Sequence, residues 1–195
     1  MRPAAASAGC LAILLAATSA PAAPPPAPVY VVDRMRDLIS PDEVVGTRRA
    51  GLMCLPNGTI RWKDIPQGDA LDRREIIQDV LEDEGQHVAS LGGTVAARRQ
   101  VRIRGVVRAA AFRLCARQWL GDRGALSGDA HLEMEWRAEN GDGADPGLRH
   151  VSTIDRHFDG KQAASLGTLF RAMLEASARD LVQWLGTART SERSR

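Results

Sequence analysis

The sequence predicts an α+β fold, a two-layer sandwich in which a mainly antiparallel sheet of about five strands carries two helices on one face. Two observations lead to this prediction. The segments 101–115 and 129–139 alternate polar and apolar residues, which is the period of a strand with one buried and one solvated face. The segment 166–185 instead repeats its apolar residues at helical spacing, which predicts an amphipathic helix whose apolar face packs against the sheet.

The first 22 residues have the anatomy of an export signal. Arg2 precedes a short apolar run, 10–17, and small residues around Ala22 form a cleavage site. The run is too short to cross a bilayer as a stable helix. We therefore expect a cleaved signal peptide at 1–22, a mature chain that begins near Ala23, and a periplasmic or secreted location.

A lipoprotein acylated at Cys10 is the alternative. The sequence disfavours it because this cysteine precedes the apolar run and lacks the usual leucine ahead of it. The Pro/Ala-rich stretch 23–28 is predicted to be an extended linker. Residues 29–186 are predicted to form a single domain, and 187–195 a flexible basic tail.

Local signals place the remaining elements of the predicted domain. Pro56-Asn57-Gly58 lies between two apolar runs and indicates a hairpin turn. Asp72 and Glu75 have capping-box spacing, and Gly85 and Gly186 are expected to end the two helices. The resulting elements are a strand at 29–32, hairpin strands at 44–55 and 59–65, a helix at 72–84, and a third main strand at 149–158.

The two alternating segments place charges of opposite sign on one face if they pair antiparallel. The predicted polar strand face carries Arg102, Arg104 and Arg108 opposite Glu133, Glu135 and Glu139. The apolar residues of the first segment change from odd to even positions after Ala111, which predicts a β-bulge there. This face neutralises itself, and we expect it to keep the protein soluble.

The overall composition excludes some functions. The chain is 44% hydrophobic and 26% charged in mixed signs, with a formal net charge of +2, so it has a core but no electrostatic footprint for nucleic acid. After the signal, no apolar run is long enough to span a membrane.

Two groups of residues are candidates for chemistry. His131, Glu133 and Glu135 share a strand face and could place three ligands near one metal. The alternative is that both carboxylates form ion pairs with the arginines of the neighbouring strand. Asp155 and His157 share a face and could orient a general base, whereas His150 points the other way. No nucleophile motif accompanies them. We assign no catalytic, cofactor-binding or metal residue.

Cys54 and Cys115 remain after the signal is removed. An even pair in an oxidising compartment suggests a disulfide, which would contribute about 3–5 kcal/mol for a loop of this length. Two separate buried thiols are the alternative, and the sequence leaves the choice open.

The order helix, glycine, strand and second strand is carried by 81–88 and 101–106. It resembles small exported envelope domains of Gram-negative bacteria, such as the periplasmic domain of the curli secretion channel subunit and small auxiliary lipoproteins. The resemblance covers 72–185 and implies an envelope-assembly or partner-binding domain without catalysis. No position matches a defined site, so no functional residue is carried over.

Two function classes follow. The first is a non-enzymatic periplasmic adaptor that needs no cofactor and binds another envelope protein, along 149–158 if that strand lies at a sheet edge. The alternative is a small periplasmic hydrolase or metal-dependent enzyme that uses His131 or His157. The sequence leaves the partner and the oligomeric state open.

Overall fold

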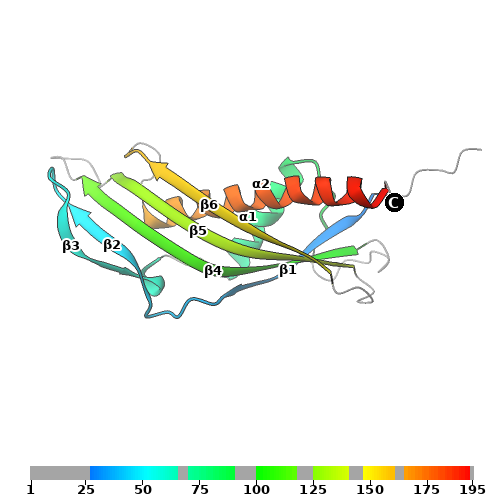
Figure 1. Ribbon diagram of the computed structural model, residues 1–195, viewed down its shortest axis with the longest axis horizontal. Helices are drawn as coiled ribbons and strands as arrows, with labels where there is room; N and C mark the ends of the chain where they lie inside the picture. Colours follow the sequence, from blue (N-terminus) through cyan, green and yellow to red (C-terminus); the bar gives the residue numbers. More distant parts are fainter. Residues whose placement is uncertain are drawn as a thin grey trace, which may run out of the picture.

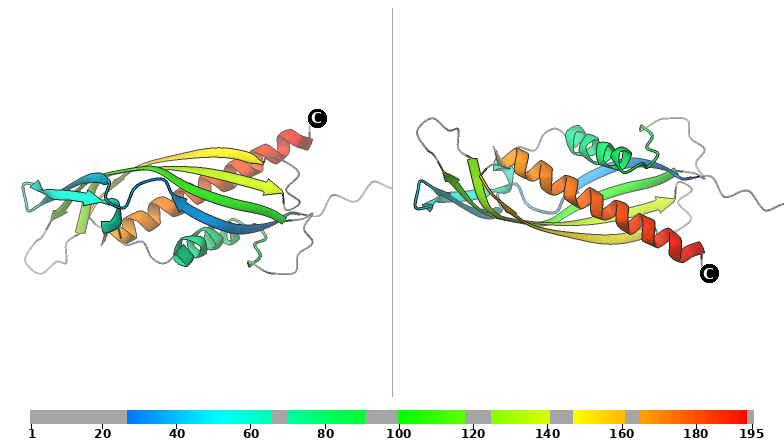
Figure 2. Two further views of the ribbon diagram at one scale, coloured as in Figure 1. Left: turned by 90° about the horizontal axis from the view of Figure 1, so that it is seen from below. Right: turned by 90° about the horizontal axis from the view of Figure 1, so that it is seen from above.

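The computed structural model describes residues 27–65, 70–90, 100–117, 125–140, 147–160 and 165–193. Within them, a mixed sheet of six strands carries two helices on one face (Figures 1 and 2). The predicted α+β class is found, but the sheet has one strand more than expected and two of its pairings are parallel. The predicted signal peptide and most of the predicted linker lie outside the described residues.

Three long strands form an antiparallel meander: β4 (Gln100–Arg117), β5 (Ala125–Asn140) and β6 (Leu148–Phe158). The predicted pairing of the two alternating segments is found as β4 and β5. Their register shifts between Val107 and Ala109, so the bulge lies at Arg108 and not after Ala111. The alanines at 109–111 are small enough for either face, so the sequence pattern could not locate the bulge.

The N-terminal strands lie one after the other along the same edge of β4. β1 (Val29–Asp37) pairs in parallel with the first half of β4, and β2 (Val44–Ala50) pairs in parallel with its second half. Between them, the Leu38 N–H donates to the Val107 carbonyl. β1 is longer than the predicted strand 29–32, because its polar second half still pairs with β4.

The hairpin of β2 and β3 (Leu55–Arg61) turns at Gly51–Cys54, so the turn predicted at Pro56-Asn57-Gly58 is wrong. Gly51 and Cys54 have positive φ, and Cys54 forms a disulfide with Cys115. Both constraints select the earlier turn. Pro56 is tolerated inside β3 because this strand is at the edge of the sheet.

A short 3₁₀ helix, η1 (Trp62–Asp64), follows β3, and α1 (Ala70–Asp83) comes close to the predicted range 72–84. Gly85, at φ +75°, ends α1 as predicted, because its N–H and that of Gln86 bond back to the last turn. α2 (Leu166–Arg193) continues past Gly186, so the predicted helix end there is wrong. A single glycine lowers helix stability by only about 1 kcal/mol and does not stop a well-packed helix.

The core lies between the sheet and the helices, where α1 packs against β1 and α2 packs against β5 and β6 (Figure 2). Trp62 packs edge-on against Phe170, with ring centroids 5.5 Å apart. Asp37 accepts bonds from the Trp62 indole and from Arg73, which is nearly fully buried. These contacts join β1, α1 and α2 at one end of the core. Neither of the two described helices is long and apolar enough to cross a membrane.

Candidate functional site: the polar sheet face and the edge strand

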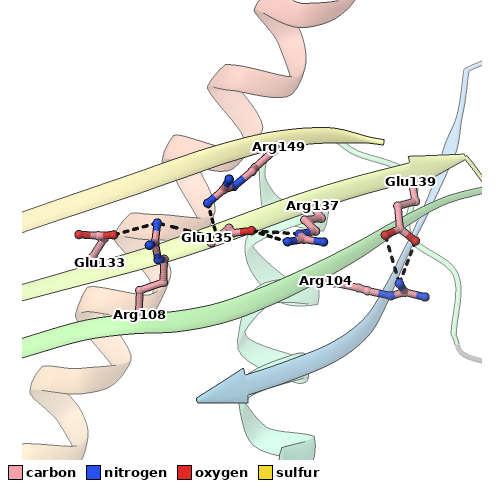
Figure 3. A network of polar contacts seen from close by, with 7 residues as sticks. All are labelled: Arg104, Arg108, Glu133, Glu135, Arg137, Glu139 and Arg149. Atoms are coloured by element: carbon pink, nitrogen blue, oxygen red, sulfur yellow. Dashed lines mark hydrogen bonds and ion pairs between the residues drawn. The ribbon is translucent and has the colours of Figure 1, made fainter. Parts of the chain in front are cut away.

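The sheet face away from the helices carries a network of arginines and carboxylates (Figure 3). The structure places Arg104 and Arg108 of β4 and Glu133, Glu135 and Glu139 of β5 on this face, as the alternation predicts. Each carboxylate contacts an arginine, so the network is internally neutralised where the two strands pair.

Glu135 is the centre of the network. Its side chain is only 8% exposed, and it accepts bonds from Arg137 at 3.0 Å and from Arg149 of β6 at 2.7 Å. Arg108 lies 3.9 Å away. Burial acts to raise the pKa of Glu135, but hydrogen bonds from Arg137 and Arg149 outweigh burial, so the pKa lies below its usual value. Glu135 is therefore a fixed anion that ties β5 to β6.

The ion pairs run diagonally and not straight across the strands. Arg102 is opposite Glu139 in register but makes no ion pair with any residue that the structure describes. Arg104 instead forms the ion pair with Glu139, at 2.9 Å, and it also contacts Asp33 of β1 at 3.1 Å. Arg104 therefore joins three strands, which the sequence pattern could not indicate because the partner Asp33 lies on a bulge of β1.

Beside this network lies a hollow of about 560 Å³, between β1 and β5. Arg34 and Arg36 of β1 line it together with Arg104 and Arg137. Within the described part of the chain, neither Arg34 nor Arg36 has a salt-bridge partner. The two lining carboxylates, Glu135 and Asp37, are already held by other arginines. The hollow could accept a carboxylate or phosphate group. The sequence did not predict it, because the first strand was expected to end at Val32, before Arg34 and Arg36.

The histidines lie in separate settings. His131 contacts Asp155 at 2.8 Å and His157 contacts Asp129 at 2.7 Å, both across β5 and β6 on the polar face. They line a second hollow of about 430 Å³ that has no serine, threonine or cysteine among its lining residues. A histidine–aspartate pair there could hold or move a proton, but these lining residues offer no nucleophile.

His150 is on the opposite face, as predicted. It stacks on Trp184 of α2 and contacts Asp180 at 2.7 Å, so it joins β6 to the helix. The candidate metal ligands do not converge either, since His131 contacts Asp155 while Glu133 contacts Arg108. Among the described residues, no three His, Cys, Asp or Glu side chains are placed to hold a metal ion.

β6 is the last strand of the sheet, with β5 on one side and no strand on the other among the described residues (Figure 1). Its pairing with β5 runs from Gly128 opposite Phe158 to Ala138 opposite Leu148 without a register shift. Leu148 and Val151 are exposed apolar side chains on this strand. The predicted strand 149–158 thus lies at an edge that could pair with another extended segment.

No family profile matches the sequence, and no curated protein is similar to it. Among solved structures, a DUF330 protein from Xanthomonas campestris has a TM-score of 0.51 and 15% identity, covering 90% of this chain and 93% of that one. An uncharacterised protein has a TM-score of 0.50 and 8% identity, covering 81% of this chain and 92% of that one. PelC from Paraburkholderia phytofirmans, solved as a dodecamer, has a TM-score of 0.38 and 14% identity, covering 83% and 95%.

The first two similarities cover most of each chain and show the fold alone, because the sequence identities are low. They show no specific family, and the resemblance to small exported envelope domains stays a prediction from the sequence.

Proposed function

We propose that this protein is an exported, non-catalytic adaptor domain of the bacterial cell envelope that binds an extended segment of a partner protein along β6. The observation that carries the proposal is the open edge of β6. Proteins usually blunt an edge strand with proline, a bulge or charged side chains, especially lysine. β6 has no proline, lysine or bulge over its 11 residues, whereas the opposite edge, β3, contains Pro56 and pairs with register shifts. Of the charged residues of β6, Arg149 and Asp155 are paired with side chains of β5, and Arg156 is exposed.

Two further features support the proposal. The Cys54–Cys115 disulfide fits an oxidising compartment and therefore export. The carboxylates next to β6 on the polar face are already paired, so an added strand would meet few unpaired charges there. The histidine–aspartate pairs keep the second candidate, a small hydrolase or metal-dependent enzyme, open to test.

A photo-crosslinking amino acid at Val151 in intact cells tests the adaptor proposal, with the same amino acid at Thr59 of β3 as the matched control. Both side chains are exposed edge-strand residues. We expect a specific crosslinked protein, identified by mass spectrometry, from position 151 and not from position 59.

Proline substitution then separates backbone pairing from side-chain contact. Successive N–H groups of a strand point to opposite sides, and positions 153 and 156 are an odd number of residues apart. Of the variants Thr153→Pro and Arg156→Pro, one therefore removes an N–H donor from the free edge of β6 and keeps the bonds to β5, and the other removes a bond to β5. The variant that keeps the bonds to β5 should keep the melting temperature and lose the crosslink. If it folds and keeps every crosslink, β6 does not bind by strand addition. If His131→Ala or His157→Ala abolishes a measurable turnover, the protein is an enzyme and the adaptor proposal is wrong.

A further inference from the structure

The turn of the β2–β3 hairpin exposes three large apolar side chains, Leu52, Met53 and Leu55, which we call the apolar tip. They are 69%, 82% and 65% exposed. The tip lies at the end of the molecule opposite the C-terminal end of α2 (Figure 1). Single exposed apolar residues are ordinary, but three within four positions of a protruding turn mark an interaction site.

The tip is held outward by covalent and backbone constraints. Cys54 is bonded to Cys115 of β4, and the Gly51 N–H donates to the Ala116 carbonyl at 3.2 Å. Within the turn, the Cys54 N–H donates a hydrogen bond to the Gly51 carbonyl. Because the backbone is already ordered on both sides of Leu52 and Met53, binding at the tip costs little further conformational entropy.

The charged residues of the hairpin itself have one sign. The hairpin from Val44 to Arg61 contains three arginines and no aspartate, glutamate or lysine. Arg48 and Arg49 are exposed on β2 and make no salt bridge with a described residue. Two carboxylates, Asp129 and Asp159, line the hollow beside the disulfide together with Arg49 and Arg113, and Asp129 is held by His157.

We propose that the apolar tip inserts into the surface of an anionic lipid bilayer. A convex tip of Leu and Met side chains fits the boundary between headgroups and acyl chains, and arginines behind it attract anionic headgroups. A protein partner would instead need a groove shaped to a protruding turn, and nothing in the tip supplies the directional polar contacts that such a groove would read. This inference does not depend on binding along β6.

Vesicle flotation of the full chain tests the inference. The probes are phosphatidylcholine vesicles with and without phosphatidylglycerol, and every variant shares the same N-terminal segment, so the comparison isolates the tip. We expect Met53→Asp to weaken partition onto the anionic vesicles by about tenfold or more, since it places a charge at the insertion point. Leu38→Asp, at an exposed apolar residue between β1 and β2, is the matched control and should bind like the parent protein.

The headgroup contribution has its own variant. Arg48→Gln combined with Arg49→Gln should reduce binding to the level found on neutral vesicles, and added salt should have the same effect on the parent protein. All substituted side chains are exposed, so unchanged melting curves are expected and will be checked. Equal partition of the parent protein and Met53→Asp would overturn the proposal, as would a crosslinked protein partner that is lost in Met53→Asp while vesicle binding is unchanged.

Discussion

Trp136 of β5 donates its indole N–H to the hydroxyl of Ser177 on α2 across 3.0 Å, and both residues are fully buried. The bond satisfies the polar atom of one of the largest core side chains. Ser177→Ala would leave the indole N–H without an acceptor in the core. We therefore expect urea unfolding to show a loss of about 1–3 kcal/mol in the free energy of unfolding.

Ser152 of β6 provides the matched control. It is also fully buried, but its hydroxyl has no hydrogen-bond partner among the described residues. Ser152→Ala should leave the free energy of unfolding unchanged or raise it by up to about 1 kcal/mol, because a desolvated hydroxyl is removed. Equal losses in Ser177→Ala and Ser152→Ala would mean that the bond to Trp136 contributes nothing specific.

The pH dependence of stability should depend on Glu135. Its pKa is lower in the folded protein than in the unfolded chain, so its contribution is fully present above the unfolded pKa and is lost as the pH falls through the folded pKa. Acidification below about pH 5 should therefore destabilise the parent protein more steeply than Glu135→Gln.

Asp42 is the control for this prediction. A hydrogen bond and the charge of Lys63 also lower the pKa of Asp42, but this carboxylate is exposed to solvent. Solvent screens such a pair, so Asp42→Asn should not change the slope. Thermal melts over a pH series measure both variants, and a parent-like slope in Glu135→Gln would contradict the assignment.

Two glycines should respond to alanine in opposite directions. A Cβ at Gly46 would lie 2.2 Å from the Phe112 carbonyl oxygen, so β2 would have to move away from β4. Gly186 is inside α2 with nothing within 4 Å of an added Cβ. We expect Gly46→Ala to destabilise by about 1–3 kcal/mol and Gly186→Ala to stabilise by about 0.5–1 kcal/mol in chemical unfolding. A destabilised Gly186→Ala would show that the helix does not continue there.

The disulfide should contribute to stability through the unfolded chain. Cys54 and Cys115 are 61 residues apart, and releasing a loop of this length should lower the free energy of unfolding by about 3–5 kcal/mol. Cys54→Ser combined with Cys115→Ser and the reduced parent protein should unfold at the same denaturant concentration. Different midpoints would mean that the serine substitutions perturb the packing around the bridge.

Local periodicity was sufficient to predict the strands β4 and β5, their polar face and the apolar stripe of α2. These elements are long, and each residue's exposure follows from its position in a repeat of two or of 3.6. The stripe residues Phe170, Met173 and Leu181 are buried as expected. The same reasoning placed Glu135 on the polar face but not at the centre of the network, because Arg149 comes from a strand whose register the sequence does not encode locally.

The parallel pairings and the hairpin turn could not be predicted, because they depend on contacts between distant residues. β1 reaches β4 only after the intervening helix has crossed over, so nothing near Val32 indicates Ile103 as its neighbour. The turn depends on Cys54, whose positive φ is unusual for a residue other than glycine and is held by a bond to Cys115. Asn57-Gly58 is a stronger local turn signal, and the tertiary contacts override it.

The shared edge of β4 also determines the order in which the sheet can be completed. When the chain is delivered from its N-terminus, as during synthesis, β1 and β2 emerge well before the strand on which they lie. The meander β4–β5–β6 consists of sequence neighbours and can close as soon as it is available, and β2 can pair at once with β3. β1 and the edge of β2 that faces β4 must wait and then join a template over a long sequence separation. During that interval these two edges have unpaired backbone groups, and a holding chaperone would have its greatest effect on them.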